Sequence, residues 1–180
     1  LKTLGGLRTM DGIMRRVDDA FTDPLELRGD SVLGVAGLLY SARAGNIVLI
    51  NPPGTGVLEN PGIVPFLPAV AHYFLGQDLR LRSPETHWCG NELSQVLARL
   101  QDFIIKPIAR GRQRDSVYAN GLNQHDLRSL ESKIRAEPWA YVAQEEVELS
   151  TTPSWNGRGL EGRPMVLRAF ACSAQDSYMI

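Results

Sequence analysis

Two short strand patterns separated by a helix-periodic stretch constrain the fold of this chain most. Residues Phe103 to Pro107 form an apolar run that is interrupted only by Lys106. Residues 127–134 carry apolar side chains at helical spacing, and Pro138 ends that stretch. A second apolar, β-branched pattern begins directly afterwards, at residues 141–147. A strand, a helix and a second strand are therefore predicted here.

The rest of the chain alternates in the same way. Further strands are predicted at residues 13–17, 47–50, within 77–90, at 164–171 and from Ser177 onward. Helices are predicted at residues 32–44, 61–75 and 92–100, with Ser31 and Asn91 as N-caps of the first and last. Strands that alternate with helices predict a layered α/β fold. The last third of the chain leans towards α+β, with antiparallel strands.

Composition and charge argue against several classes of function. The chain of 180 residues has nineteen basic and twenty acidic side chains, so it offers no broad cationic field for nucleic acid. Its longest apolar stretches fall short of the ~20 residues that a membrane helix needs. The two cysteines provide no disulfide framework, which favours a reducing cytoplasm. We therefore expect a cytoplasmic protein that binds neither nucleic acid nor membrane, with an undetermined oligomeric state.

Lys106 is one of three lysines in a chain with sixteen arginines. An ammonium group at the end of an apolar strand suits a phosphate or a carboxylate as a point-charge partner. A lysine that reaches solvent from a sheet edge gives the same pattern. Spacing alone leaves both interpretations open.

Three polar side chains, Gln144, Glu145 and Glu146, follow one another in the second strand of the unit. Because side chains alternate along a strand, two of them share one face and the third lies on the other. Together with Val147 and Glu148, this segment can offer carboxylates to a ribose and backbone groups to an adenine edge. A solvated edge strand is the alternative.

A glycine-rich turn and a histidine–cysteine pair each allow a functional and a structural interpretation. Residues 51–59 lie between a predicted strand and a predicted helix, where α/β proteins often bind anions. They lack the motifs of a P-loop and of a dinucleotide-binding turn, so a structural turn is the alternative. His87 and Cys89 fit a metal pair or a base and nucleophile, but no third ligand or orienting group flanks them.

Two further groups of charged residues are candidates. Four of them crowd the end of the first predicted strand, as a site for an anionic or amino-bearing substrate would: Arg15, Arg16, Asp18 and Asp19. Exposed ion pairs would look the same. Arg163 and Arg168 flank a later apolar run, where arginine suits bidentate phosphate recognition but also occurs as an ordinary sheet-edge residue.

Read in order, these features resemble the ATP-grasp fold, in its circularly permuted branch that is related to glutathionylspermidine synthase and was long described as of unknown function. The resemblance rests on the strand with Lys106, the later strand with Gln144 to Glu148, and the arginines at 163 and 168. Other segments fit the same branch: residues 1–6, 15–19, 23–28, 51–59, 88–90 and 149–153. It covers essentially the whole chain.

The resemblance implies a role for each part. Residues 99–180 would be the nucleotide-binding segment, and residues 1–98 the substrate side. The lysine would contact the nucleotide phosphates, and the later strand would hold adenine and ribose: Lys106, then Gln144, Glu145, Glu146, Val147 and Glu148. Catalytic arginines, Arg163 and Arg168, would neutralise the transferred phosphoryl group. The substrate would meet Arg15, Arg16, Asp18 and Asp19.

Such ligases use ATP and Mg²⁺ to convert a carboxylate into an acyl phosphate, which an amine then attacks. The resemblance therefore predicts the nucleotide-binding part of an ATP-dependent carboxylate–amine ligase with small-molecule substrates. Residues 109–114 are arginine-rich where many relatives are glycine-rich. The family's metal ligands are expected before Leu1, so this chain is expected to be an inactive fragment. A non-catalytic nucleotide-binding or scaffolding domain is the alternative.

Overall fold

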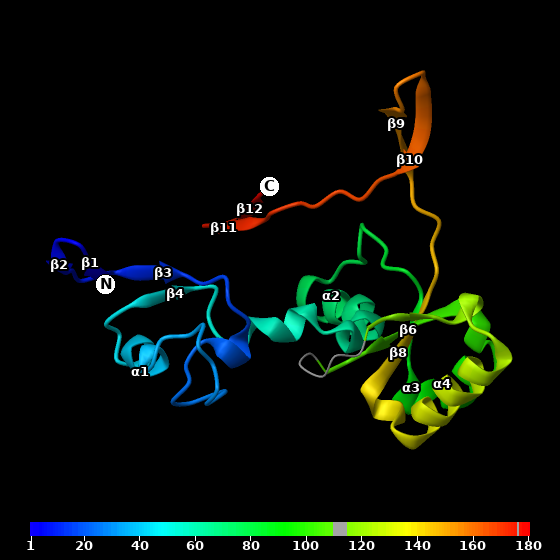
Figure 1. Ribbon diagram of the computed structural model, residues 1–180, viewed down its shortest axis with the longest axis horizontal. Coiled ribbons are helices and arrows are strands. Elements are labelled where there is room, and N and C mark those ends of the chain that lie inside the picture. The colour runs from blue at the N-terminus through cyan, green and yellow to red at the C-terminus, as the bar shows by residue number, and fades with distance from the viewer. Residues whose placement is uncertain (110–114, 176) are drawn as a thin grey trace.

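The computed structural model describes residues 1–109, 115–175 and 177–180. Its central unit is a four-stranded antiparallel sheet in the order β5-β8-β6-β7, of which Figure 1 labels the two inner strands, β6 and β8. The strands are β5 (Thr86–Trp88), β6 (Phe103–Pro107), β7 (Val117–Tyr118) and β8 (Tyr141–Glu145). Two helices, α3 (Cys89–Ala98) and α4 (Gln124–Ala136), belong to this unit. The predicted strand–helix–strand arrangement of residues 103–147 is therefore confirmed, with β8 ending at Glu145.

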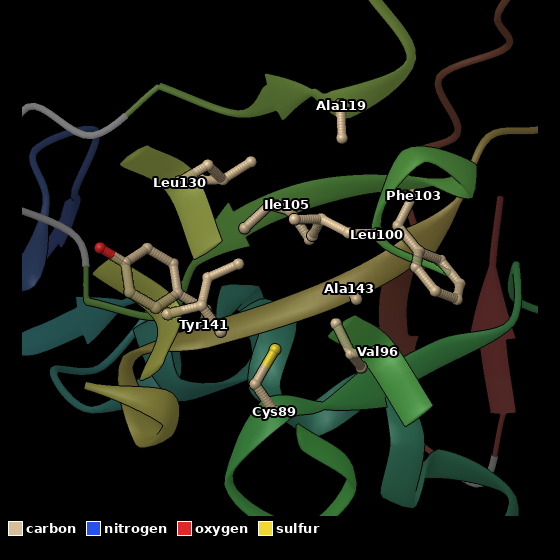
Figure 2. Packing of buried hydrophobic residues seen from close by; sticks show 10 residues of the cluster. Cys89, Val96, Leu100, Phe103, Ile105, Ala119, Leu130, Tyr141 and Ala143 are labelled. Carbon is tan, nitrogen blue, oxygen red and sulfur yellow. The ribbon is translucent and has the colours of Figure 1, made fainter. Parts of the chain in front are cut away.

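The register of β6 against β8 assigns alternate side chains to the two faces of the sheet. Ile105 lies opposite Ala143, and Lys106 lies opposite Val142. The odd-numbered side chains of both strands pack with side chains of the helices in one hydrophobic core. Figure 2 shows these side chains between the strands and the helices. The buried members of this core are Cys89, Val96, Leu100, Phe103, Ile105, Ala119, Leu130, Ile134, Tyr141 and Ala143.

The even-numbered side chains face the other way, towards a second helical layer. This layer consists of the 3-10 helix η3 (Pro61–Phe66) and α2 (Leu67–Leu75), and η3 contacts both β5 and β8. The ring of Phe66 meets Trp88 edge-on, with 6.4 Å between the ring centroids. The predicted helix at 61–75 is thus divided, because its prolines disturb regular α-helical bonding. Within the described residues, no helix has the length and apolar character needed to cross a membrane.

The N-terminal part forms a separate small layer. Strands β3 (Gly12–Met14) and β4 (Val48–Ile50) pair in parallel, and α1 (Leu38–Arg43) lies between them in the chain. A short 3-10 helix, η1 (Asp19–Phe21), follows β3, and another, η2 (Thr55–Glu59), follows β4. The first residues form a small hairpin, β1 (Lys2–Thr3) with β2 (Gly6–Leu7). The predicted strand at 13–17 is therefore shorter and begins one residue earlier.

The helix predicted at residues 32–44 is reduced to the six residues of α1. Gly34 packs so closely on the preceding loop that a Cβ there would lie 2.1 Å from the carbonyl oxygen of Phe21. Gly37 has a left-handed φ of +79°, which a regular helix cannot contain. Tertiary contacts have replaced the first turns that the apolar periodicity predicted.

Asp23 holds this loop from inside. It is fully buried, and its carboxylate accepts backbone hydrogen bonds from Leu25, Gly37 and Leu39 at 3.0, 3.1 and 3.0 Å. Burial acts to raise the pKa of the Asp23 carboxyl, but these hydrogen bonds and the nearby charge of Arg43 outweigh burial and lower the pKa. The ionised carboxylate therefore stabilises the fold.

The last third contains two hairpins. β9 (Thr151–Trp155) pairs with β10 (Leu160–Pro164), and β11 (Cys172–Ala174) pairs with β12 (Ser177–Met179). The β9–β10 hairpin projects away from the four-stranded sheet (Figure 1). The strand prediction for residues 164–171 is wrong, because β10 ends at Pro164 and the chain then runs without a strand to β11. The strand predicted from Ser177 is confirmed.

The missed hairpin had a sequence signal. Asn156 and Gly157 form an Asn-Gly pair, and Gly157 has a left-handed φ of +93°. The Asn156 side chain accepts hydrogen bonds from the amides of Arg158 and Gly159, both at 2.9 Å. This turn fixes the register of β9 and β10. As a result β10 ends at Pro164, just before the apolar residues 165–167 that were predicted to form the strand.

Replacing Ile134 tests the core between α4 and the sheet. Ile134→Ala is expected to lower the free energy of unfolding by about 2–5 kcal/mol, because a fully buried side chain leaves a cavity. Chemical denaturation followed by circular dichroism measures this loss. Ser129→Ala, on the exposed side of the same helix, is the control and should stay within about 0.5 kcal/mol of the parent. Equal effects of the two substitutions would contradict the core described here.

Replacing Asp23 tests its buried carboxylate. Because folding lowers its pKa, the charge stabilises the fold at pH values above the unfolded pKa of about 3.9, and this stabilisation is lost as pH falls through the folded pKa. Asp23→Asn should therefore lower the melting temperature at pH 7, and the gap to the parent should narrow below about pH 4. Asp78→Asn removes a fully exposed carboxylate as a control. A gap that stays constant with pH would refute this role.

Candidate functional site

A line of polar side chains crosses three strands of the sheet. The ammonium of Lys106 donates to the Oε1 atom of Gln144 at 2.5 Å. The Nε2 atom of Gln144 donates to the hydroxyl of Thr86 at 3.0 Å. All three side chains are half-buried. The structure thus brings together two of the predicted nucleotide-binding residues, on the sheet face away from α3 and α4.

Strand pairing explains why these side chains meet. Gln144 lies opposite Ile104 in β6 and opposite Thr86 in β5, so it occupies the centre of the line. Lys106 is the diagonal neighbour of Gln144 on the same face, a spacing that long side chains can bridge. A neutral carboxamide beside the ammonium satisfies one donor without cancelling its charge. This group therefore keeps a net positive charge.

The carboxylates that follow Gln144 differ in their surroundings. Glu145 is joined to the edge strand, since its amide donates to the Glu85 carbonyl and its Oε1 accepts from the Glu85 amide, both at 2.9 Å. Glu146 accepts a hydrogen bond from the side chain of Asn120 at 2.5 Å. Glu146, Val147 and Glu148 are exposed, just beyond the end of β8. The strand end therefore presents carboxylates and backbone groups to solvent.

Arg15 is largely committed to the protein itself. Its guanidinium donates to the carbonyls of Val17, Asn51 and Pro52 at 2.5, 3.1 and 3.3 Å, and its side chain is only 10% exposed. It also forms an ion pair with Asp19 at 2.5 Å. Arg15 thereby ties the segment after β3 to the turn after β4.

Asp19 holds the same turn from the other side. Its Oδ2 accepts from the backbone amides of Gly54 and Gly56 at 2.8 and 3.1 Å. Partial burial acts to raise the pKa of Asp19, but these two hydrogen bonds and the Arg15 charge outweigh burial and lower the pKa. The amides of the glycine-rich turn thus bind an anion that the chain supplies itself.

Arg16 and Asp18, unlike Arg15 and Asp19, have exposed side chains. Both line a cleft of about 880 Å³, the N-terminal cleft. Its walls come from residues 14–21, Arg28, parts of residues 50–59 and residues 169–172. Of the four charged residues predicted here, two bind the turn and two line this cleft with exposed side chains.

The predicted catalytic arginines lie elsewhere. Arg163 is an exposed residue of β10, in the projecting hairpin, and its Nε donates to Glu161 at 2.5 Å. Arg168 is an exposed residue of the extended segment between β10 and β11. The structure does not bring either into the line formed by Lys106 and Gln144, so their catalytic role stays a prediction. The arginine-rich stretch after Lys106 falls, from residue 110 to 114, outside the described residues.

His87 and Cys89 have separate environments. Cys89 is a fully buried member of the core, and burial raises the pKa of its thiol to about 11, which is unsuited to a nucleophile. His87 lies between two carboxylates, with Nδ1 2.6 Å from Glu92 and Nε2 3.2 Å from Glu85. Among residues 1–109, 115–175 and 177–180, no three or more His, Cys, Asp or Glu side chains are arranged to hold a metal ion.

Three contributing residues escaped the sequence interpretation: Thr86, Glu85 and Asn120. Each is hydrogen-bonded to a residue of the segment 144–146, either through the pairing of β5 with β8 or across the end of the sheet. Thr86 is separated from Gln144 by 58 positions, and no local pattern announces that β5 pairs with β8. A register prediction for the whole sheet would have been needed to find them.

A family model matches the whole chain, and similar proteins occur in several bacteria. The family described as circularly permuted ATP-grasp type 2 matches residues 1–180. The uncharacterized protein Rv2411c of Mycobacterium tuberculosis is 39% identical over 173 residues, which are 95% of this chain and 31% of that protein. Uncharacterized protein sll0335 of Synechocystis is 31% identical over 182 residues, which are 100% of this chain and 38% of that protein.

A third relative, uncharacterized protein Rv2567 of Mycobacterium tuberculosis, is 33% identical over 180 residues, 99% of this chain and 20% of that protein. The chain thus spans between a fifth and two fifths of the length of these relatives. The match over every residue confirms the resemblance seen in the order of the Lys106 strand and the β8 strand. This chain belongs to the circularly permuted ATP-grasp type 2 family.

Proposed function

We propose that this chain supplies the nucleotide-binding part of an ATP-dependent carboxylate–amine ligase. The observation that carries the proposal is the ammonium of Lys106 held beside the carboxamide of Gln144, next to a strand end with exposed carboxylates. A charged lysine on a sheet face suits phosphate oxygens. Glu146 and Glu148 suit ribose hydroxyls, and the backbone near Val147 suits an adenine edge.

The chemistry of such a ligase needs positioning more than covalent assistance. In such a ligase, ATP bound with Mg²⁺ would transfer its γ-phosphoryl group to a substrate carboxylate and leave as ADP. An amine would then attack the acyl phosphate and displace inorganic phosphate. In this proposal Lys106 orients the phosphates and offsets their negative charge. The carboxylates after β8 hold the other end of the nucleotide. In this proposal the Mg²⁺ ligands belong to other parts of the full-length protein, as the resemblance to ATP-grasp ligases implies.

The substrate side of the proposal is the N-terminal cleft. Arg16 suits a substrate carboxylate, and Asp18 suits an amine. Arg15 and Asp19 shape the cleft wall by holding the turn at residues 51–59. Phe170 and other apolar residues also line the cleft, which favours a small molecule that carries both charged and apolar groups.

A second candidate function is nucleotide binding without catalysis. The placement of Arg163 favours it, because this arginine is paired with Glu161 in a hairpin that projects from the sheet. Arg163 and Arg168 take part in phosphoryl transfer only if the hairpin lies against the nucleotide in the full-length protein. Release of ADP by that protein, with amino acids, peptides and polyamines as trial substrates, separates the two candidates: turnover supports the ligase, and nucleotide binding without turnover supports the second function.

Replacing Lys106 tests the nucleotide site. In the full-length protein, Lys106→Ala should weaken ATP binding at least about tenfold, since a charge-assisted hydrogen bond contributes about 1.5–3 kcal/mol. Isothermal titration calorimetry with Mg²⁺ and ATP measures the affinity. Lys2→Ala, which removes a lysine from the exposed N-terminal hairpin, is the matched control and should bind as the parent does. An unchanged affinity in Lys106→Ala would overturn the assignment.

Replacing Arg16 tests the substrate cleft. With any carboxylate substrate found by ADP release, Arg16→Ala should raise KM about tenfold or more and leave ATP affinity unchanged, because only the substrate contact is lost. Steady-state kinetics with the full-length protein measures both effects. Arg8→Ala removes an exposed arginine outside the cleft as a control. The cleft assignment fails if KM is the same in Arg16→Ala and in the parent.

A further inference from the structure

The polar line of Lys106 and Gln144 continues to the backbone through Thr86. The hydroxyl of Thr86 accepts from Gln144 and itself donates to the carbonyl of Pro84 at 2.9 Å. Four groups are therefore linked in one direction, from an ammonium to a backbone carbonyl.

Donor and acceptor chemistry fixes the direction of the line. Lysine only donates, and a backbone carbonyl only accepts. The single hydroxyl proton of Thr86 goes to Pro84, so the Thr86 oxygen is left as an acceptor. The carboxamide of Gln144 must then present its NH₂ to Thr86 and its oxygen to Lys106. The opposite orientation would set donor against donor at the lysine.

The backbone carbonyl at the end of the line is itself well held. The neighbouring residue, Glu85, is fixed to Glu145 by two hydrogen bonds of 2.9 Å, one in each direction. Thr86 begins β5 directly opposite Gln144 in the sheet. The line therefore runs from its one charged group, nearer the centre of the sheet, to hydrogen-bonded backbone at the sheet edge.

We propose that Thr86 is a positioning residue: its hydroxyl locks the orientation of the Gln144 carboxamide and so aims the Lys106 ammonium. This inference rests on the proposed function, in which Lys106 contacts the nucleotide phosphates. A long lysine side chain that is already held in place loses less conformational freedom on binding. Without the hydroxyl, the NH₂ of the carboxamide loses its acceptor, so Gln144 is held by one contact fewer and the Lys106 ammonium is held less firmly in place.

The test is a double-mutant cycle for ATP binding in the full-length protein, measured by calorimetry with Mg²⁺ and ATP. Thr86→Val keeps the shape and removes the hydroxyl, and should weaken binding about three- to tenfold, which is the loss of one typical hydrogen bond. Thr86→Ser keeps a hydroxyl and should bind within about twofold of the parent. In a Gln144→Ala background, Thr86→Val should have no further effect, because the group that it orients is gone.

Each outcome bears on the proposal. An equal loss from Thr86→Val with and without Gln144 would show a merely structural role and overturn it, as would parental binding by Thr86→Val. If Thr86→Val does not fold, Thr86→Ala takes its place in the same cycle. If neither Lys106→Ala nor Gln144→Ala weakens ATP binding, the nucleotide site itself is wrong; if both weaken it but Thr86→Val does not, only the role of Thr86 fails.

Discussion

The antiparallel pairing of β6 with β8 is the interaction on which the candidate site depends. It buries Ile105 and Ala143 on the helical side and thereby forces Lys106 and Gln144 onto the opposite face. A shift of one residue in register would bury the lysine and expose the core. Burial of apolar surface on one face thus determines where the charge lies on the other. The proposed contact with nucleotide phosphates follows from packing that serves stability.

Charged groups in the N-terminal part serve mainly as internal anchors. Asp23 binds three backbone amides, Asp19 binds two, and Arg15 donates to three backbone carbonyls. Such groups replace the regular hydrogen bonding that short strands and 3-10 helices lack. Of these, Arg15 and Asp19 hold the turn at residues 51–59, and the exposed Arg16 lies beside the cleft. A substrate site on the chain would therefore rest on charged side chains that are paired within the protein.

Much of this fold was predictable, but its pairings were not. Periodicity located β6, α4 and β8, because a core of this size needs continuous apolar runs and a clear helical stripe. It failed at α1, where Asp23 and Gly34 impose a turn through contacts with distant residues. The lysine was suspected from its isolation on an apolar strand. Its partner Thr86 was missed, since antiparallel pairing of strands 58 positions apart leaves no local trace.

The most direct test of the account is photolabelling of the full-length protein with 8-azido-ATP and Mg²⁺, followed by mapping of the labelled peptides. The account predicts label within residues 141–148, with protection by unlabelled ATP, because the photoreactive group is on the adenine and this segment is proposed to hold adenine and ribose. Label confined to the N-terminal cleft, or to parts of the protein outside this chain, would contradict it.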